Sequence, residues 1–263
     1  MSRGRERIGV IGGSGIGEFL GGATTAVHRV STPYGPPSAP IEEVRVGDRT
    51  ALFLPRHGVG HTIPPHRVNY RANIDALCSL GVEAIVTVSS VGSLAEGLPP
   101  GSFVLPTQFI DFTRQRPTTF FDGGKVFHVS MADPFCPDLL GLATEAGRAT
   151  GHPFATGRTY LCVEGPRFST RAESRYFRTL ADVIGMTLVP EVTLARERGR
   201  CYACLAMVTD FDVWADTPVE ARQVVETMRR NVGGMREVLS DLLQRMAAPV
   251  TCRCAHALDE AGI

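Results

Sequence analysis

The sequence has almost no lysine, since Lys125 is the only lysine among its 27 basic residues. The others are arginines, which bind oxyanions well but cannot readily carry out lysine chemistry. Acidic residues also number 27, so the formal net charge is zero and creates no overall attraction to nucleic acid or to an anionic membrane. We therefore expect neither of these as a partner.

Long apolar segments are also missing. No run reaches the roughly 18 residues that a transmembrane helix requires. The apolar stretch at residues 8–11 is too short, and too much interrupted by glycine, for a signal peptide. Internal repeats and low-complexity blocks are absent as well. These features predict a soluble cytoplasmic protein.

Short apolar runs alternate with longer amphipathic segments through most of the chain. With 263 residues and 43% hydrophobic content, the chain can form one large α/β core. No Pro/Gly/Ser-rich linker divides it, so we expect one domain over residues 1–248, followed by a cysteine-containing tail over residues 249–263. The expected strands are residues 8–11, 50–54, 84–88, 103–110, 158–163 and 202–208, and the expected helices are residues 65–80, 138–150, 171–180, 192–198 and 218–246.

A glycine-rich turn follows the first strand at residues 12–17. It does not match the dinucleotide fingerprint, because Glu18 stands where the third glycine is needed. Its exposed N–H groups and the Ser14 hydroxyl could still hold a single phosphate. A tight turn without any ligand is the alternative.

Further polar clusters follow two other strands. Arg56 and His57 come after residues 50–54, and Ser89 and Ser90 come after residues 84–88. An arginine fork, an imidazole and hydroxyls suit an oxyanion, although each cluster alone also fits an ordinary turn or a structural histidine. Because ligands of α/β sheets bind at the carboxyl ends of strands, the clusters together predict an oxyanion site.

Two carboxylates, Asp210 and Asp212, follow the last apolar strand. Positions i and i+2 of a strand share a face, so both could contact one ligand. No nearby histidine or third acid completes a magnesium or calcium site. We therefore expect them to accept hydrogen bonds from ligand N–H groups rather than to bind metal, the alternative being two solvated loop acids.

Seven cysteines include a C-x-x-C pair, Cys201 and Cys204, and a C-x-C pair, Cys252 and Cys254. These four could in principle hold zinc. Cys204 lies within a predicted strand, which argues against convergence of both members of its pair on one ion. We therefore predict no metal site, and core thiols or disulfides instead. A Cys252–Cys254 disulfide, or one joining Cys136 to Cys201 or Cys204, stays open.

Several motifs resemble those of the trimeric purine nucleoside phosphorylases, and most closely the branch that acts on 5'-methylthioadenosine. The resemblance covers roughly residues 7–245, and its most specific part is the run of residues 164–168 followed by residues 186–191. The motifs are Gly12-Gly13-Ser14-Gly15, Arg56-His57-Gly58, the run of residues 61–73, Glu164-Gly165-Pro166-Arg167-Phe168, Met186-Thr187-Leu188-Val189-Pro190-Glu191 and Thr209-Asp210-Phe211-Asp212.

The resemblance implies a single α/β domain with a central, mixed and partly barrel-like sheet flanked by helices. It also implies a reaction in which phosphate attacks C1' of 5'-methylthioadenosine, giving adenine and 5-methylthioribose 1-phosphate. Phosphate would be a co-substrate, and no cofactor is expected. A phosphate dianion beneath the sugar would stabilise an oxocarbenium-like transition state. By the family pattern, the phosphate ligands are Ser14, Arg56, His57, Ser89, Ser90 and Thr187.

The same pattern assigns the nucleoside contacts. Met186 would pack on the sugar, Phe168 would contact the base, and Asp210 would assist the leaving purine at N7. Relatives that act on 6-oxopurines carry asparagine at the position of Asp210, so a carboxylate here, with Asp212 nearby, favours adenine. Ser169 and Phe211 complete the expected base contacts.

No histidine occurs between His152 and His256, whereas relatives acting on ordinary nucleosides use one there to bind the 5'-hydroxyl. An apolar 5' pocket would suit a methylthio group and leave a hydroxyl without a partner. The residues expected to line it are Ala221, Val224 and Val225.

His128 resembles a residue that this family lends to a neighbouring subunit's site, which implies a homotrimer or a dimer of trimers. The alternative activities are a purine nucleoside phosphorylase of broader or 6-oxopurine specificity, and one acting on another 5'-deoxy-5'-substituted adenosine. A hydrolase would be indifferent to phosphate, and a non-catalytic nucleotide-binding module would release no base.

Overall fold

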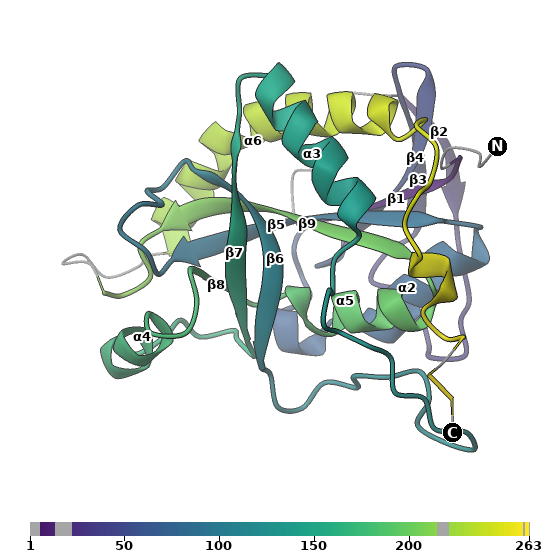
Figure 1. The fold of residues 1–263 in the computed structure, drawn as a ribbon, viewed down its shortest axis with the longest axis horizontal. Coiled ribbons are helices and arrows are strands. Elements are labelled where there is room, and N and C mark those ends of the chain that lie inside the picture. The colour runs from purple at the N-terminus through teal and green to yellow at the C-terminus, as the bar shows by residue number, and fades with distance from the viewer. Residues whose placement is uncertain (1–5, 14–22, 215–220, 260, 263) are drawn as a thin grey trace.

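The computed structural model describes residues 6–13, 23–214, 221–259 and 261–262. Nine strands in these ranges form one mixed sheet in the order β2-β3-β4-β1-β5-β8-β7-β6-β9, and β9 pairs back onto β5. The five strands from β5 to β9 therefore close into a barrel, while β1 to β4 extend the sheet from one side (Figure 1). This confirms the expected single α/β domain with a mixed, partly barrel-like sheet.

The strands are β1 (Ile8–Gly12), β2 (Thr24–His28), β3 (Ile41–Val46), β4 (Arg49–Pro55), β5 (Ala84–Ser93), β6 (Phe103–Phe112), β7 (Phe154–Val163), β8 (Val183–Gly185) and β9 (Cys201–Asp210). The helices are α2 (Tyr70–Ser79), α3 (Pro137–Ala149), α4 (Arg171–Phe177), α5 (Leu188–Glu197) and α6 (Ala221–Arg245), with short 3-10 helices at Pro65–Arg67 and Cys254–His256.

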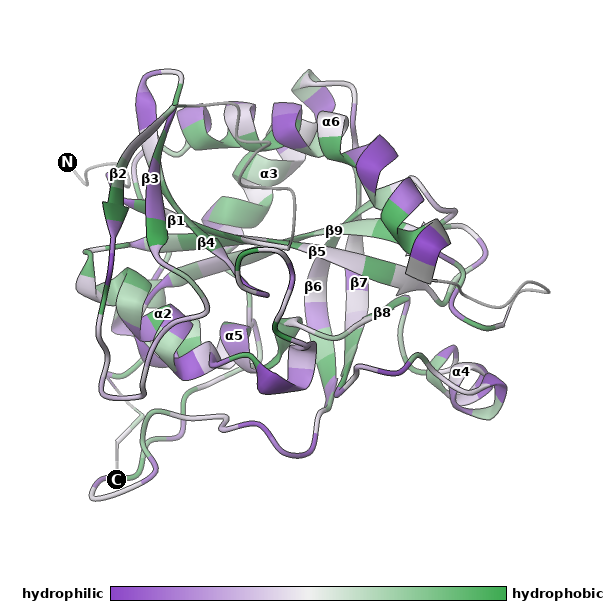
Figure 2. Ribbon diagram, turned by 180° about the vertical axis from the view of Figure 1, so that it is seen from behind, coloured by the Kyte–Doolittle hydropathy of each residue, from purple (hydrophilic) through white to green (hydrophobic). Residues whose placement is uncertain are grey.

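The sheet is covered on both faces, as its apolar strands predict. On one side, α3 and α6 pack in a core that includes Val86, Leu139 and Leu242. On the other, α2 and α5 pack in a core that includes Leu77 and Val192. Figure 2 shows the alternation of polar and apolar residues along α6 that allows one face of this helix to bury against the sheet. No helix among the described residues is both apolar and long enough to span a bilayer.

Each predicted helix and strand overlaps an observed one, but several bounds differ: β7 begins at Phe154 rather than residue 158, α5 begins at Leu188 rather than residue 192, and α4 ends at Phe177 rather than residue 180. The helix expected from residue 65 begins at Tyr70, because Asn69 caps it by accepting a hydrogen bond from the Ala72 N–H at 3.2 Å. Strands β2, β3 and β8 were not predicted. Strand β2 is a largely exposed edge strand, and β8 has only three residues, so neither carries a clear periodic signal.

The parallel pairs place several strand ends at one edge of the sheet. Strand β5 runs parallel to both β1 and β9. The cluster of residues 89–93, expected to follow a strand, belongs to β5 itself, where Ser89 and Ser90 pair with Ala206 and Met207 of β9. Ser89 and Ser90 of β5, which were expected to bind an oxyanion, and Asp210 at the end of β9 therefore lie on adjacent strands.

Candidate active site

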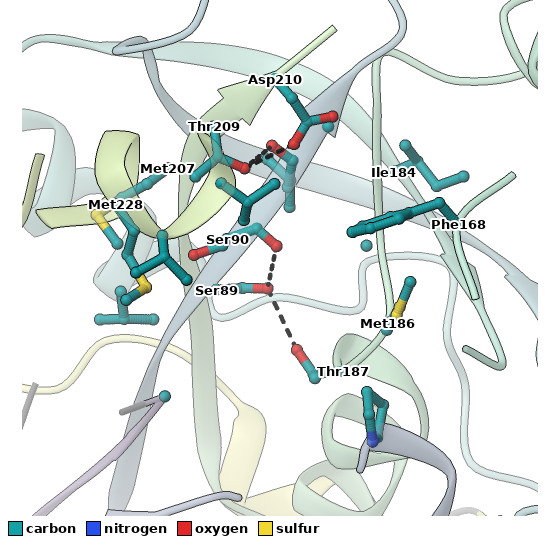
Figure 3. Close-up of a pocket in the computed structure, with 18 of the residues that line it drawn as sticks. Ser89, Ser90, Phe168, Ile184, Met186, Thr187, Met207, Thr209, Asp210 and Met228 are labelled. Atoms are coloured by element: carbon teal, nitrogen blue, oxygen red, sulfur yellow. Dashed lines mark hydrogen bonds between the residues drawn. The ribbon is translucent and has the colours of Figure 1, made fainter. Parts of the chain in front are cut away.

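A cavity of about 670 Å³ opens where β4, β5, β8 and β9 end, with α6 along one wall. Most of the side chains predicted from the sequence meet here (Figure 3). Those lining it are Arg56, His57, Ser89, Ser90, Phe168, Ser169, Met186, Thr187, Asp210, Asp212, Val224 and Val225.

Four predicted residues are not in that set. Ser14 and the side chain of Ala221 lie outside the described residues. Phe211 does not line the cavity, and its ring instead makes an edge-on contact with Trp214 at 5.2 Å. His128 is also absent from the lining, since it lies in the loop between β6 and α3, where its N–H donates to the Ala261 carbonyl at 2.8 Å.

Arg56, immediately after β4, is only 2% exposed. Its Nε and Nη2 donate to the two carboxylate oxygens of Glu191, the Nη2 bond being 3.0 Å long, and its Nη1 donates to the Val88 carbonyl at 3.2 Å. Tyr202 donates to the same carboxylate at 3.1 Å. Burial opposes the guanidinium charge, but Glu191 outweighs burial and raises the pKa of Arg56 above its ordinary value. Arg56 is thus a fixed cation with a fixed orientation.

His57 is neutral in this site. Burial, and then the charge of Arg56, lowers the pKa of His57 to about 4. Its Nδ1 lies 2.8 Å from the Ile63 carbonyl, which can only accept, so Nδ1 carries the proton and Nε2 is left as an acceptor. The His61 ring stacks on it at 4.4 Å. A neutral imidazole with a free lone pair is suited to the protonated oxygen of an oxyanion.

Hydroxyl groups extend this polar end of the cavity. The Ser89 hydroxyl lies 3.2 Å from the Thr187 hydroxyl and 3.1 Å from the Tyr160 hydroxyl. Thr187 is the N-cap residue of α5 and makes no capping bond with its side chain. Its hydroxyl is therefore directed to the Ser89 hydroxyl rather than to its own helix (Figure 3).

Asp210, the last residue of β9, forms the other polar end. Its two carboxylate oxygens accept hydrogen bonds of 2.8 Å from the Thr209 hydroxyl and from the Asp212 N–H. Burial raises the pKa of the Asp210 carboxyl above its ordinary value, even though these bonds favour the charged form. Burial therefore favours the protonated form of the Asp210 carboxyl more than solvent exposure would.

Asp212 is nearly buried, at 4% exposed, and adopts a left-handed conformation with φ of 50°. Its Oδ2 is buried and has no hydrogen-bond partner among the described residues. Burial raises the pKa of this carboxyl as well, although the nearby Ser174 and Ser169 hydroxyls and the Val213 N–H oppose the rise. An unsatisfied buried acceptor is costly, so this oxygen is a natural partner for a donor on a ligand.

Two glycines make room for these side chains. At Gly165, whose φ is 68°, a Cβ would lie 2.6 Å from the Met186 sulfur. At Gly92, a Cβ would lie 2.8 Å from an Asp210 carboxylate oxygen. Larger residues at either position would displace Met186 or Asp210 from the cavity.

The wall formed by α6 is mainly apolar, and Arg229 is its one charged lining residue among those described. Val224, Met228 and Val232 are spaced by four residues and therefore lie on one face of the helix, and Met207 of β9 completes this wall. Val224 and Val225 were expected from the sequence and the others were not, although the four-residue spacing was a usable signal. Nor were His61, Pro65, Ile184 and Thr209 expected, of which His61 and Pro65 lie in the motif of residues 61–73.

The family model described as the phosphorylase superfamily matches residues 7–244, which include every strand of the closed barrel. The chain belongs to this superfamily. Among curated relatives, an S-methyl-5'-thioadenosine phosphorylase from Thermofilum pendens is 52% identical over 98% of this chain and 99% of its own. The one from Pyrococcus abyssi is 51% identical over 96% and 97%.

Solved structures agree with these relatives. A methylthioadenosine phosphorylase from an Antarctic soil metagenomic library is 41% identical, with a TM-score of 0.93 over 99% of this chain and 93% of its own. The methylthioadenosine phosphorylase of Schistosoma mansoni, solved in complex with adenine, is 39% identical, with a TM-score of 0.89 over 93% of both chains.

Proposed function

We propose that this protein is a pentosyltransferase that cleaves 5'-methylthioadenosine with inorganic phosphate, giving adenine and 5-methylthioribose 1-phosphate. The observation that carries the proposal is a single cavity with an arginine–histidine–hydroxyl end, a carboxylate end and an apolar wall. The first of these suits the phosphate anion, the second suits the purine, and the third suits the methylthio group. The names of the relatives point to the same reaction.

Phosphate would bind at Arg56, His57, Ser89, Ser90 and Thr187, and we expect Ser14 to add a further hydroxyl. The Glu191 carboxylate compensates Arg56 while the site is empty, so no lone buried charge has to be maintained. Phosphate held here lies on one side of the sugar and is oriented for attack at C1'. Its negative charge then stabilises the positive charge that develops on the sugar.

The leaving purine gains electron density as the C1'–N9 bond breaks. We assign Asp210 as the group that donates a hydrogen bond or a proton to N7, which its raised pKa favours. The proton would pass to the departing base, giving neutral adenine, and solvent would restore it to the enzyme. Asp210 is the only side chain to which we assign a proton-transfer role.

Recognition of adenine rests on acceptors at the base end. The buried Oδ2 of Asp212 can accept from the exocyclic amine, whereas a 6-oxo group would bring a second acceptor to it. Phe168 and Ser169 would contact the base from the opposite wall. Because a mismatch at a buried polar group can cost orders of magnitude in kcat/KM, hypoxanthine nucleosides should be poor substrates.

The 5' substituent would lie against Val224, Val225, Met228 and Met207. These side chains offer no hydrogen bond to a 5'-hydroxyl but pack well on a thioether. We further propose a homotrimer or a dimer of trimers in which His128 contributes to a neighbour's site, and a cytoplasmic location. Light scattering of the purified chain would test the assembly.

The experiment is a substrate panel of methylthioadenosine, adenosine and inosine, run in phosphate and in phosphate-free buffer, with released base measured by chromatography. Phosphate-dependent adenine release, fastest from methylthioadenosine, is expected. Base release that is indifferent to phosphate would overturn the mechanism, and faster cleavage of inosine would overturn the assignments of Asp210 and Asp212.

A further inference from the structure

A cluster of four cysteines lies at the end of the sheet opposite the cavity. Its members are Cys136, Cys201, Cys252 and Cys254, and their sulfur atoms all lie within 4.8 Å of one another. Cys201 is the first residue of β9 and Asp210 is the last, so the length of a ten-residue strand separates the cluster from the carboxylate end of the active site. No step of the proposed reaction uses these thiols.

The cluster revises the expectation from the sequence. The C-x-x-C motif does not act as a unit, because Cys204 belongs to the core on the face of α2 and α5, whereas Cys201 belongs to the core on the face of α3 and α6. Residues i and i+3 of a strand point to opposite faces. Cys136, which precedes α3, replaces Cys204 as the fourth sulfur. Sixty-odd residues separate it from Cys201 along the chain, so no local motif could reveal this.

From this geometry we propose that the four thiolates form a closed tetrahedral site for one zinc ion. Zinc–sulfur bonds of about 2.3 Å in a tetrahedron place the sulfurs about 3.8 Å apart. The Cys201 and Cys252 sulfurs are 3.4 Å apart, and every other pair lies within 4.8 Å. Two disulfides would need two bonded pairs, but they would not require all four sulfurs to converge on one point.

The backbone around the cluster is held by other contacts, which is what a preorganised site needs. The Cys136 N–H donates to the Tyr202 carbonyl at 2.9 Å, joining the start of α3 to β9. The Asp138 carboxylate accepts from the N–H groups of Thr251 and Cys252 at 2.8 and 3.1 Å, which fixes the C-terminal segment. Figure 1 shows these three segments converging beside α5.

Zinc at this place would be structural. With four protein ligands it has no open position for water or substrate. It would join α3, β9 and the C-terminal segment, which are distant in sequence. Binding replaces the four thiol protons by one Zn²⁺, so protons are released and no electrons are exchanged.

The test is metal analysis of the full-length protein, produced in zinc-supplemented cells and purified without reductant or chelator. We expect one zinc per chain, little reactivity of the four thiols until a strong chelator is added, and a lower Tm after chelation. Replacing zinc by Co²⁺ should give the charge-transfer bands of a tetrahedral tetrathiolate site.

The Cys254→Ser and Cys252→Ser variants should lose the metal, whereas the Cys78→Ser variant, outside the cluster in α2, should keep it as a matched control. Because a variant may fold poorly, the cobalt spectrum of the wild-type protein provides an independent readout. A wild-type protein without zinc, either with its four cysteines joined in disulfides or with all four reactive, would overturn the proposal. So would zinc retained by both serine variants.

Discussion

Asp210 offers the sharpest test of the mechanism through the Asp210→Asn variant. The change keeps the size of the side chain and an acceptor for the Asp212 N–H, and its amide can donate to the Thr209 hydroxyl, so the fold should be preserved. It removes the carboxyl proton that can be transferred to N7 and leaves only an amide that can donate a hydrogen bond. General acid catalysis contributes about 10²- to 10⁴-fold, so kcat on methylthioadenosine should fall by that factor, or about 3–5 kcal/mol in barrier height.

The assay should pair methylthioadenosine with 5'-methylthioinosine, which differ only on the base. An amide can donate to the 6-oxo group that a carboxylate repels, so Asp210→Asn should lose activity on the adenosine compound while its relative kcat/KM for the inosine compound rises. The exposed Asp48 provides a matched control, since Asp48→Asn makes the same chemical change away from the cavity. Turnover of methylthioadenosine by Asp210→Asn within about threefold of wild type would refute the role of Asp210 in general acid catalysis.

Three further outcomes follow from the same site. Glu191→Gln leaves Arg56 buried without its counter-charge, so the free energy of unfolding should fall by about 3–5 kcal/mol, and the KM for phosphate should rise more than kcat falls; an unchanged phosphate KM would contradict a positioning role. Val225→His places a hydrogen-bonding group at the 5' wall, so kcat/KM should shift toward adenosine and away from methylthioadenosine; an unchanged ratio would show that Val225 does not contact the 5' substituent. As the pH falls from 6.5, the pKa of His57 in the unfolded chain, through about 4, its pKa in the folded protein, the free energy of unfolding without phosphate should fall by roughly 3 kcal/mol. The reason is that the unfolded state binds the proton first. Urea unfolding across that pH range measures this loss, and the His57→Gln variant should not show it.

The sequence predicted most of the residues that line the cavity because many of them lie at the ends of buried strands. Ser89 and Ser90 on β5 pair directly with β9, which ends at Asp210, so the rule that ligands bind at the carboxyl ends of strands was enough to bring them together. The motif resemblance then supplied Thr187 and Met186, whose positions depend on a barrel closure that periodicity alone does not reveal.

The residues that were missed share a different physical cause. Met207 points into the cavity from the interior of a strand that reads as continuous core, and nothing in a fully apolar run marks which face meets a ligand. Glu191 occurs in a recognised motif, but its pairing with Arg56 spans 135 positions. Long-range pairing of buried charges is set by tertiary packing, so no local pattern could have predicted it.

Strand β9 connects the two sites of the molecule. Its last residue is the carboxylate assigned to the leaving purine, and its first is one of four convergent cysteines. The strand pairs with β5 along nearly its whole length. A displacement at its start would therefore shift the position of Asp210 relative to Ser89. A zinc ion that joins α3, β9 and the C-terminal segment would therefore stabilise the strand that aligns the base end and the phosphate end of the cavity. On this reasoning, chelation should lower the temperature at which phosphorolysis is lost and leave KM at low temperature unchanged, whereas a raised KM at low temperature would mean that the cysteine end of β9 also sets the geometry of the cavity.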